Sequence, residues 1–168
     1  MRGQGDHMPQ MLTRMVPVAL LVLALDRVSK LWVVEWLDLR RMGEMEVLPP
    51  YFNLVMAWNK GVNFGILNFG DSGRWVLVAL ALVIVLGVLI WTRRAVGWLV
   101  PVSVGLIVGG ALGNVWDRVH YGAVADFINM SCCGLRNPFA FNVADVAIFA
   151  GAIVLILFGD KGLKPGDG

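Results

Sequence analysis

Long runs of apolar residues, separated by shorter polar stretches, dominate the chain. A helix needs roughly 20 such residues to cross a bilayer core about 30 Å thick. Four runs predict transmembrane helices, over residues 15–34, 75–91, 95–116 and 138–159. The second and third runs contain no charged residue, and the fourth contains only Asp145. The pattern therefore predicts an all-α membrane protein with four transmembrane helices.

The segments between these runs comprise one short turn and two longer loops. Residues 35–74 begin with mixed charges and continue into the aromatic-rich stretch Tyr51–Trp58, which predicts a small β-rich cradle of short strands. Asn59–Gly61 is typical of a turn. We expect residues 117–137, which contain several glycines, to form an outer loop or short helix, and residues 92–94 to form a tight turn.

Lysine and arginine residues near the helix ends indicate how the chain is oriented, because cytoplasmic segments collect them. One side of the predicted bundle carries these residues with little opposing charge: Arg14, Arg93, Arg94, Lys161 and Lys164. The other side mixes basic and acidic residues within the two longer loops. We therefore expect residues 1–14, 92–94 and 160–168 to be cytoplasmic and the β-rich cradle to lie outside.

The composition agrees with a membrane protein and excludes several functions. Hydrophobic residues make up 58% of the 168 residues and charged residues only 15%, against about 25% charged in soluble domains. A net charge of +2 without a basic stripe excludes a nucleic-acid partner. Cys132 and Cys133 are adjacent and cannot form a disulfide framework, and His7 and His120 are too few to predict a zinc site. We expect a monomer.

The unusual polar residues of the apolar runs gather in one layer near the non-cytoplasmic surface. In an alternating four-helix topology this layer contains Asp26, Arg27, Lys30, Asn114, Asp117, Arg118, Asp126, Asn142 and Asp145. Asp145 would lie about 10 Å below the start of the fourth helix, at 1.5 Å per residue. Each charge in a membrane span costs about 2.5–3.5 kcal/mol unless it faces the interior and pairs. The layer is therefore a candidate site.

Two interpretations of the charged pairs stay open. Asp26 and Lys30 are four residues apart with the acid first, which is the favourable order for a helical ion pair. Together with Asp117 and Arg118 they would form either a structural network that holds the helices together or part of a site. Glycines at 105, 109 and 113 form a small-residue stripe, which predicts close approach of another helix.

Asp145 needs a partner from elsewhere in the chain, because no lysine, arginine or histidine lies within one helical turn of it. Asp126 is the natural candidate. Two carboxyl groups brought together in a low-dielectric site cannot both ionise, so they share a proton. The ionised member would take a proton from water, and the protonated member would stabilise the oxyanion formed from a peptide carbonyl.

Other chemistries are not indicated, although two alternatives to an enzyme remain. The chain has no HExxH, Walker A or GxSxG motif. Ser29 and Lys30 are neighbours on one helix, so they point in different directions and make a poor dyad. A proton-coupled transporter is one alternative, because buried carboxylates also mark ion pathways. A structural membrane subunit, whose polar layer only fixes packing, is the other.

Five sequence boxes resemble those of the lipoprotein signal peptidase (signal peptidase II) family. They are Asp26–Lys30 (D-x-x-[ST]-K), Asn59–Gly65 (N-x-G-x-x-F-[GS]), Gly109–Arg118 (G-G-A-x-G-N-x-x-D-R), Ala125–Phe127 (V-D-F) and Phe141–Asp145 (F-N-x-A-D). Their order and spacing are specific, and the similarity spans nearly the whole chain. Asn63 stands where the family usually has a small residue, and Ala125 replaces the commoner valine.

This resemblance implies an aspartic endopeptidase of the bacterial inner membrane. Such enzymes cleave prolipoproteins before a diacylglyceryl-modified cysteine, are inhibited by globomycin-type cyclic peptides and use no cofactor. Asp126 and Asp145 match the catalytic pair. Further residues match positions that orient this pair, hold the substrate or support the site: Asp26, Lys30, Asn59, Gly61, Asn114, Asp117, Arg118 and Asn142. The implied partners are the modified prolipoproteins and membrane lipid.

Overall fold

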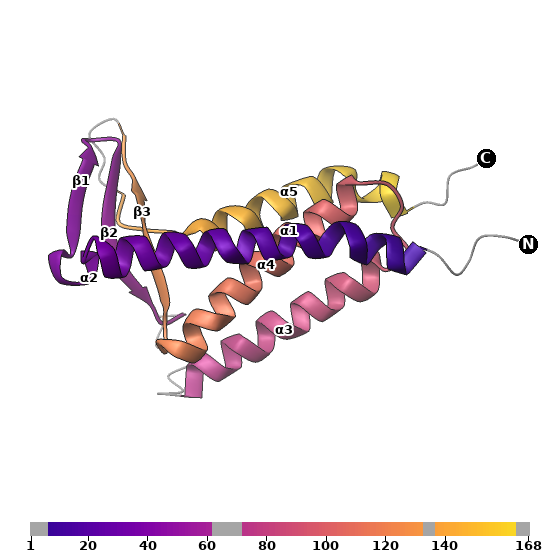
Figure 1. The fold of residues 1–168 in the computed structure, drawn as a ribbon, viewed down its shortest axis with the longest axis horizontal. Helices are drawn as coiled ribbons and strands as arrows, with labels where there is room; N and C mark the ends of the chain where they lie inside the picture. Colours follow the sequence, from indigo (N-terminus) through magenta and orange to yellow (C-terminus); the bar gives the residue numbers. More distant parts are fainter. Residues whose placement is uncertain (1–6, 62–71, 133–136, 164–168) are drawn as a thin grey trace, which may run out of the picture.

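The computed structural model describes residues 7–61, 72–132 and 137–163, in which long helices lie side by side and a small sheet covers one end of them (Figure 1). The long helices are α1 (His7–Lys30), α3 (Gly73–Thr92), α4 (Leu99–His120) and α5 (Val143–Leu163). A π-helical segment (Leu31–Trp36) and the short α2 (Leu39–Met42) lead from α1 to the strands β1 (Glu44–Leu48) and β2 (Phe52–Asn59). Strand β3 (Val124–Met130) lies between α4 and α5 in the chain.

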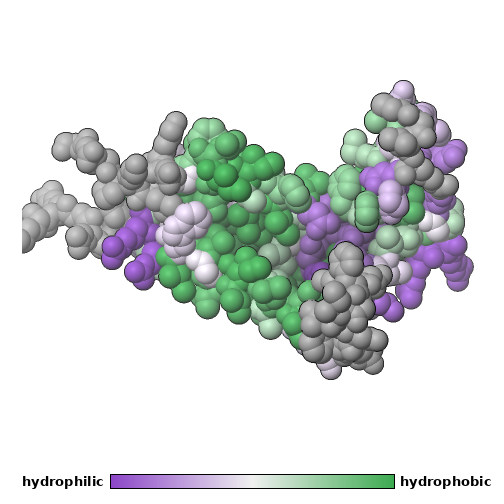
Figure 2. All heavy atoms as spheres, turned by 180° about the vertical axis from the view of Figure 1, so that it is seen from behind, coloured by the Kyte–Doolittle hydropathy of each residue, from purple (hydrophilic) through white to green (hydrophobic). Residues whose placement is uncertain are grey.

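The helical part of the molecule has the surface of a membrane protein. Within the described parts of the chain, three helical stretches are long and apolar enough to cross a bilayer: Met8–Trp36, Gly73–Thr92 and Leu99–His120. Helix α5 contributes a shorter apolar stretch, Val143–Gly159. Figure 2 shows the apolar belt over this part, with hydrophilic residues between the belt and the sheet. An exposed apolar surface of this extent is typical of contact with lipid.

Helix α4 lies at the centre because its glycines admit a helix on each of two faces. A Cβ on Gly109 would lie 2.5 Å from the carbonyl oxygen of Ala19 in α1. Gly105 and Gly113 also face α1, so the predicted packing stripe is confirmed. Gly110, which lies off this stripe, faces α5, where a Cβ would come within 2.5 Å of the carbonyl oxygen of Ala144. Small residues thus allow both neighbours to approach the α4 backbone.

The sheet is antiparallel with the order β1-β2-β3, and β3 corrects the prediction of an outer loop over residues 117–137. In its register, Ala57 of β2 lies opposite Asp126, and Asn59 lies opposite Val124. Strand formation here depends on cross-strand contacts with β2, which precedes β3 by a whole helical hairpin. Local sequence alone could not reveal that partner.

Several helix boundaries also differ from the prediction. Helix α1 begins at His7 rather than residue 15, so the polar start of the chain is partly helical. Helix α4 continues to His120 and therefore contains Asp117 and Arg118. Helix α5 begins at Val143 rather than residue 138, because the segment before it pairs with β3 through an Ile128–Phe141 bridge.

Candidate active site

Asp145 lies in the first turn of α5, and Asn142 caps that helix. The backbone N–H of Asp145 donates to the Asn142 side-chain oxygen at 2.9 Å, and the N–H of Asn142 donates to an Asp145 carboxylate oxygen at 3.2 Å. This reciprocal pair is a capping box with Asp in the third helical position. Asp145 is therefore half-buried at the helix entrance instead of deep in a span as predicted.

Asp126 extends from β3 toward the same capping residue. Its side chain is 3% exposed, and the Asn142 Nδ2 donates to its Oδ1 at 2.6 Å. The Asn59 Nδ2, from the end of β2, donates to the other oxygen, Oδ2, at 3.0 Å. The structure thus brings Asp126 and Asp145 to two sides of one asparagine, although they come from a strand and a helix.

Asn114 of α4 completes a chain of amides across the site. Its Nδ2 donates to Asp145 Oδ1 at 2.8 Å, and its own oxygen accepts from Asn142 Nδ2 at 3.2 Å. Each carboxylate therefore receives side-chain hydrogen bonds from neutral amides. Such donors stabilise the ionised form of a carboxyl group without supplying a fixed positive charge.

Burial raises the pKa of the Asp126 carboxyl from 3.8 to about 6. The hydrogen bond from Asn59 opposes this rise, and the nearby charge of Asp145 adds to it. The hydrogen bond from Asn142 and the charge of Lys30 act in the lowering direction. A carboxyl group with a pKa near neutrality can exchange a proton at physiological pH, as acid–base catalysis requires.

A second, fully charged cluster lies beside the two carboxyls. Lys30 Nζ is 2.9 Å from an Asp26 oxygen and 2.6 Å from an Asp117 oxygen, which confirms the predicted Asp26–Lys30 pair. Arg27 binds the same two aspartates. Among the described residues Asp117 thus forms its ion pairs with two cations of α1 and not with its sequence neighbour Arg118. Neighbours in a helix point about 100° apart, so a partner on a packed helix is the better placed.

Arg118 and Gly61 lie at the border of the site. The Arg118 guanidinium donates to the carbonyl of Asn114 at 3.3 Å and interacts electrostatically with both Asp126 and Asp145. Gly61 has a φ of +95°, and a Cβ there would overlap the Leu77 side chain of α3. Its N–H donates to the Asn59 side-chain oxygen at 2.9 Å. A glycine is therefore required where the chain leaves β2.

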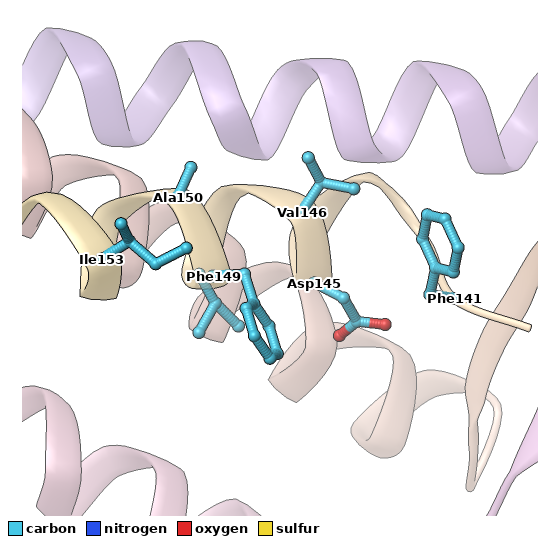
Figure 3. A pocket seen from close by; sticks show the side chains of 7 residues that line it. Phe141, Asp145, Val146, Phe149, Ala150 and Ile153 are labelled. Carbon is cyan, nitrogen blue, oxygen red and sulfur yellow. The ribbon is translucent and has the colours of Figure 1, made fainter.

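An apolar groove runs from Asp145 along the outer face of α5 (Figure 3). It has a volume of about 680 Å³, and its other lining residues are Phe141, Val146, Ile148, Phe149, Ala150 and Ile153. The Asp145 carboxylate lies near one end of this row of side chains (Figure 3). A ligand with an apolar tail could lie along α5 while a polar group meets the carboxylate.

The predicted residues Asp26, Lys30, Asn59, Gly61, Asn114, Asp117, Arg118, Asn142, Asp126 and Asp145 all lie in this region. Asn63, Phe64 and Gly65 of the second box lie outside the described residues, as does Cys133. Sequence reasoning assigned no role to Arg27 or to the backbone N–H groups of Ala125 and Ala144. Arg27 stands beside Asp26 in an apolar run, and a second buried cation there was a signal that another acidic partner existed.

The chain is similar to known proteins over most of its length. The family described as signal peptidase (SPase) II matches residues 18–159. A lipoprotein signal peptidase of Methylorubrum extorquens is 49% identical over 142 residues, which cover 83% of this chain and 82% of that protein. One from Caulobacter vibrioides is 40% identical over 141 residues, with coverage of 83% and 82%.

Solved structures show the same architecture. A bacterial membrane enzyme structure obtained by the in meso method at 2.3 Å resolution matches with a TM-score of 0.72 and 26% identity, covering 94% of each chain. A second, at 1.9 Å resolution, matches with a TM-score of 0.73 and 27% identity, covering 87% of this chain and 92% of the other.

Proposed function

The chain belongs to the signal peptidase II family, and from this we propose that it is a membrane aspartic endopeptidase that removes the signal peptide from bacterial prolipoproteins. The cut falls before the diacylglyceryl-modified cysteine. The observation that supports this most directly is the amide-bridged pair, in which Asn142 contacts both Asp126 and Asp145.

Asp126 and Asp145 form the catalytic dyad and share one proton. The ionised carboxylate takes a proton from a water molecule, whose oxygen attacks the carbonyl carbon of the scissile peptide bond. The protonated carboxyl donates a hydrogen bond to the oxyanion that develops on the carbonyl oxygen. When the C–N bond breaks, a proton passes to the leaving amine and the dyad returns to its shared state.

The surrounding residues orient the dyad and the substrate. Asn59, Asn114 and Asn142 direct the carboxylate oxygens, since each donates to at least one of them. Arg118 provides positive charge beside both carboxyls, where it can bind the substrate backbone. Gly61 itself lies against Leu77 of α3 at the end of the β-rich cradle, which holds the segment to be cut.

The location of the site suits a substrate anchored in a membrane. The enzyme spans the bacterial inner membrane four times, with both termini in the cytoplasm and the site near the outer face. Support comes from the sheet at one end of the helices, whereas α1 begins and α5 ends at the other (Figure 1). The acyl chains of the modified cysteine hold the scissile bond at this depth, and the groove along α5 accepts apolar groups.

Turnover of a lipid-modified preprotein by the purified enzyme in detergent tests this function. We expect cleavage immediately before the modified cysteine, and no cleavage of the same preprotein when its cysteine is replaced by serine and stays unmodified. Equal cleavage of both preproteins would contradict the substrate assignment. A proton-coupled transporter would instead show ion flux in vesicles without any cleavage.

A further inference from the structure

Two buried aspartates of the helical bundle each hold the backbone immediately before one dyad residue. Asp117 Oδ2 accepts a hydrogen bond from the N–H of Ala125 at 3.2 Å. Asp26 Oδ1 accepts one from the N–H of Ala144, also at 3.2 Å. Ala125 precedes Asp126 on β3, and Ala144 precedes Asp145 on α5. The positions of both dyad residues therefore depend on where these two carboxylates lie.

The two carboxylates are in turn joined to each other by two cations of α1. Arg27 Nη2 lies 2.7 Å from Asp26 Oδ2 and 2.5 Å from Asp117 Oδ1. Lys30 Nζ lies 2.6 Å from Asp117 Oδ2 and contacts both oxygens of Asp26, at 2.9 Å from Oδ1 and 3.0 Å from Oδ2. All four carboxylate oxygens are therefore bound. The oxygens that hold the Ala125 and Ala144 backbone face Lys30, and Arg27 binds the other oxygen of each carboxylate.

We propose that Arg27 is a positioning residue, which fixes the distance between Asp26 and Asp117 and through them the separation of Asp126 and Asp145. This inference rests on the proposed function, because it concerns the same dyad. Arg27 touches neither dyad residue in the described part of the chain. It acts through two hydrogen-bonded steps on each side, a carboxylate and a backbone N–H.

Charge balance explains why one cation would not be enough. Asp26 and Asp117 are 0% exposed, and together with Arg27 and Lys30 they form a cluster of zero net charge. Without the guanidinium, two buried carboxylates would share a single ammonium group, and their repulsion would be poorly screened. The carboxylates would move apart, and this displaces the backbone that they hold.

The geometry around Arg27 suits such a bridge. The same Nη2 that contacts both carboxylates also reaches the carbonyl of Gly113 at 3.4 Å. A Cβ at Gly113 would lie 2.6 Å from Asp26 Oδ2, so the absence of a side chain there makes room for the contact. A planar guanidinium is pre-organised for bridging oxygens, whereas the ammonium of lysine is a point charge on a flexible stem.

The test compares Arg27→Met, Arg27→Lys and the control Arg41→Met in turnover of a lipid-modified preprotein across a pH series. Arg41 belongs to an exposed pair with Asp38 and serves as the matched loss of one arginine. We expect Arg27→Met to lower kcat by roughly 100-fold, as for a misplacement of about 1 Å, with KM changed less than about threefold. Arg27→Lys should lower kcat by about 10-fold, and Arg41→Met should behave like the wild type.

The pH profile separates positioning from general structural support. A loosened β3 admits water to Asp126, which lowers the pKa of its carboxyl toward the ordinary value. Loss of the shared proton from Asp126 sets the basic limb of the kcat profile, so this limb should move to lower pH in Arg27→Met. Thermal unfolding shows whether each variant is folded, and Arg27→Lys, which keeps the charge balance, decides the test if Arg27→Met does not fold.

Several results would overturn the inference. A folded Arg27 variant with wild-type kcat and an unmoved basic limb would show that the guanidinium does not position the dyad. A lower kcat with an unmoved limb would assign Arg27 to general structure. Absence of turnover by the wild-type enzyme would contradict the proposed function instead, so the two failures are distinguishable.

Discussion

Two pairs of aspartates lie beside each other in this molecule, and their surroundings differ in kind. Asp26 and Asp117 are fully buried and bound by two cations, Arg27 and Lys30, at distances of 2.5–2.9 Å. Every charge of that cluster has an opposite partner. An ion pair of this sort is costly to break, because removing one partner leaves a buried charge uncompensated.

Asp126 and Asp145 have no ion pair in the part of the chain that the structure describes; neutral amides bind them instead. The pKa of Asp126 is about 6, whereas a carboxylate paired with a cation would be held ionised. The comparison indicates that the two pairs of aspartates have different roles. Fixed opposite charges suit residues that hold structure, and amide donors suit carboxyl groups that must gain and lose a proton.

The largest expected effect is a loss of activity when either residue of the Asp126–Asp145 pair is replaced. Asp126→Asn and Asp145→Asn should each lower turnover of the lipid-modified preprotein by about 1,000-fold or more, since each removes one acid–base partner. The free energy of unfolding at pH 7 should not fall in Asp126→Asn. Its native pKa of about 6 exceeds the ordinary 3.8, so the folded state loses stability as the pH rises from about 3.8 to about 6, and this loss is complete at pH 7.

Near-normal turnover by either dyad variant would contradict the dyad assignment. A folded and inserted protein, verified by thermal unfolding and by extraction from membranes, is the control in both cases.

A change in the charged cluster should have the opposite effect. It should lower mainly the free energy of unfolding, whereas the dyad variants lose activity. Lys30→Met leaves Asp26 and Asp117 with one cation at a site where Lys30 is 3% exposed. We expect the free energy of unfolding to fall by about 3–5 kcal/mol, measured by denaturant titration in mixed micelles. Arg41→Met, in an exposed pair, should cost less than about 1 kcal/mol. Equal losses of unfolding free energy in Lys30→Met and Arg41→Met would contradict the structural role of the buried cluster.

The smallest expected effect concerns the amides themselves. Asn59→Ala removes a hydrogen bond that lowers the pKa of Asp126, so this pKa should rise above about 6. The basic limb of the pH–rate profile, which reports loss of the shared proton, should move to higher pH by about one unit. Asn53→Ala, on the same strand, is the matched control, because its side-chain oxygen has no hydrogen-bond partner among the described residues. A limb that moves equally in both variants would contradict the role of Asn59.

Parts of this architecture could be predicted residue by residue. The glycines at 105, 109 and 113 indicated a helix contact because a four-residue spacing places them on one face. The Asp26–Lys30 pair could be predicted for the same reason, since both residues lie on α1. The partners of Asp117 could not, because they depend on how α1 packs against α4.

Strand β3 and the start of α5 were missed for a related reason. Val124–Met130 becomes a strand by pairing with β2, and Phe141 is drawn to β3 instead of beginning the last helix. Asp145 consequently lies at a helix entrance, capped by Asn142, and not within a continuous apolar span. Hydropathy measures only the solvent preference of a segment and carries no information about these hydrogen-bond partners.

Sequence alone determined what is local: apolar runs of membrane-spanning length, the small-residue stripe of α4 and the gathering of polar residues toward one end of the helices. Tertiary structure decided which of those polar residues meet. Whether an aspartate becomes one half of a fixed ion pair or part of an amide-bound pair depends on groups delivered by other helices and strands. Electrostatic and hydrogen-bond energies fall steeply with distance, so a few ångströms of packing separate the two outcomes.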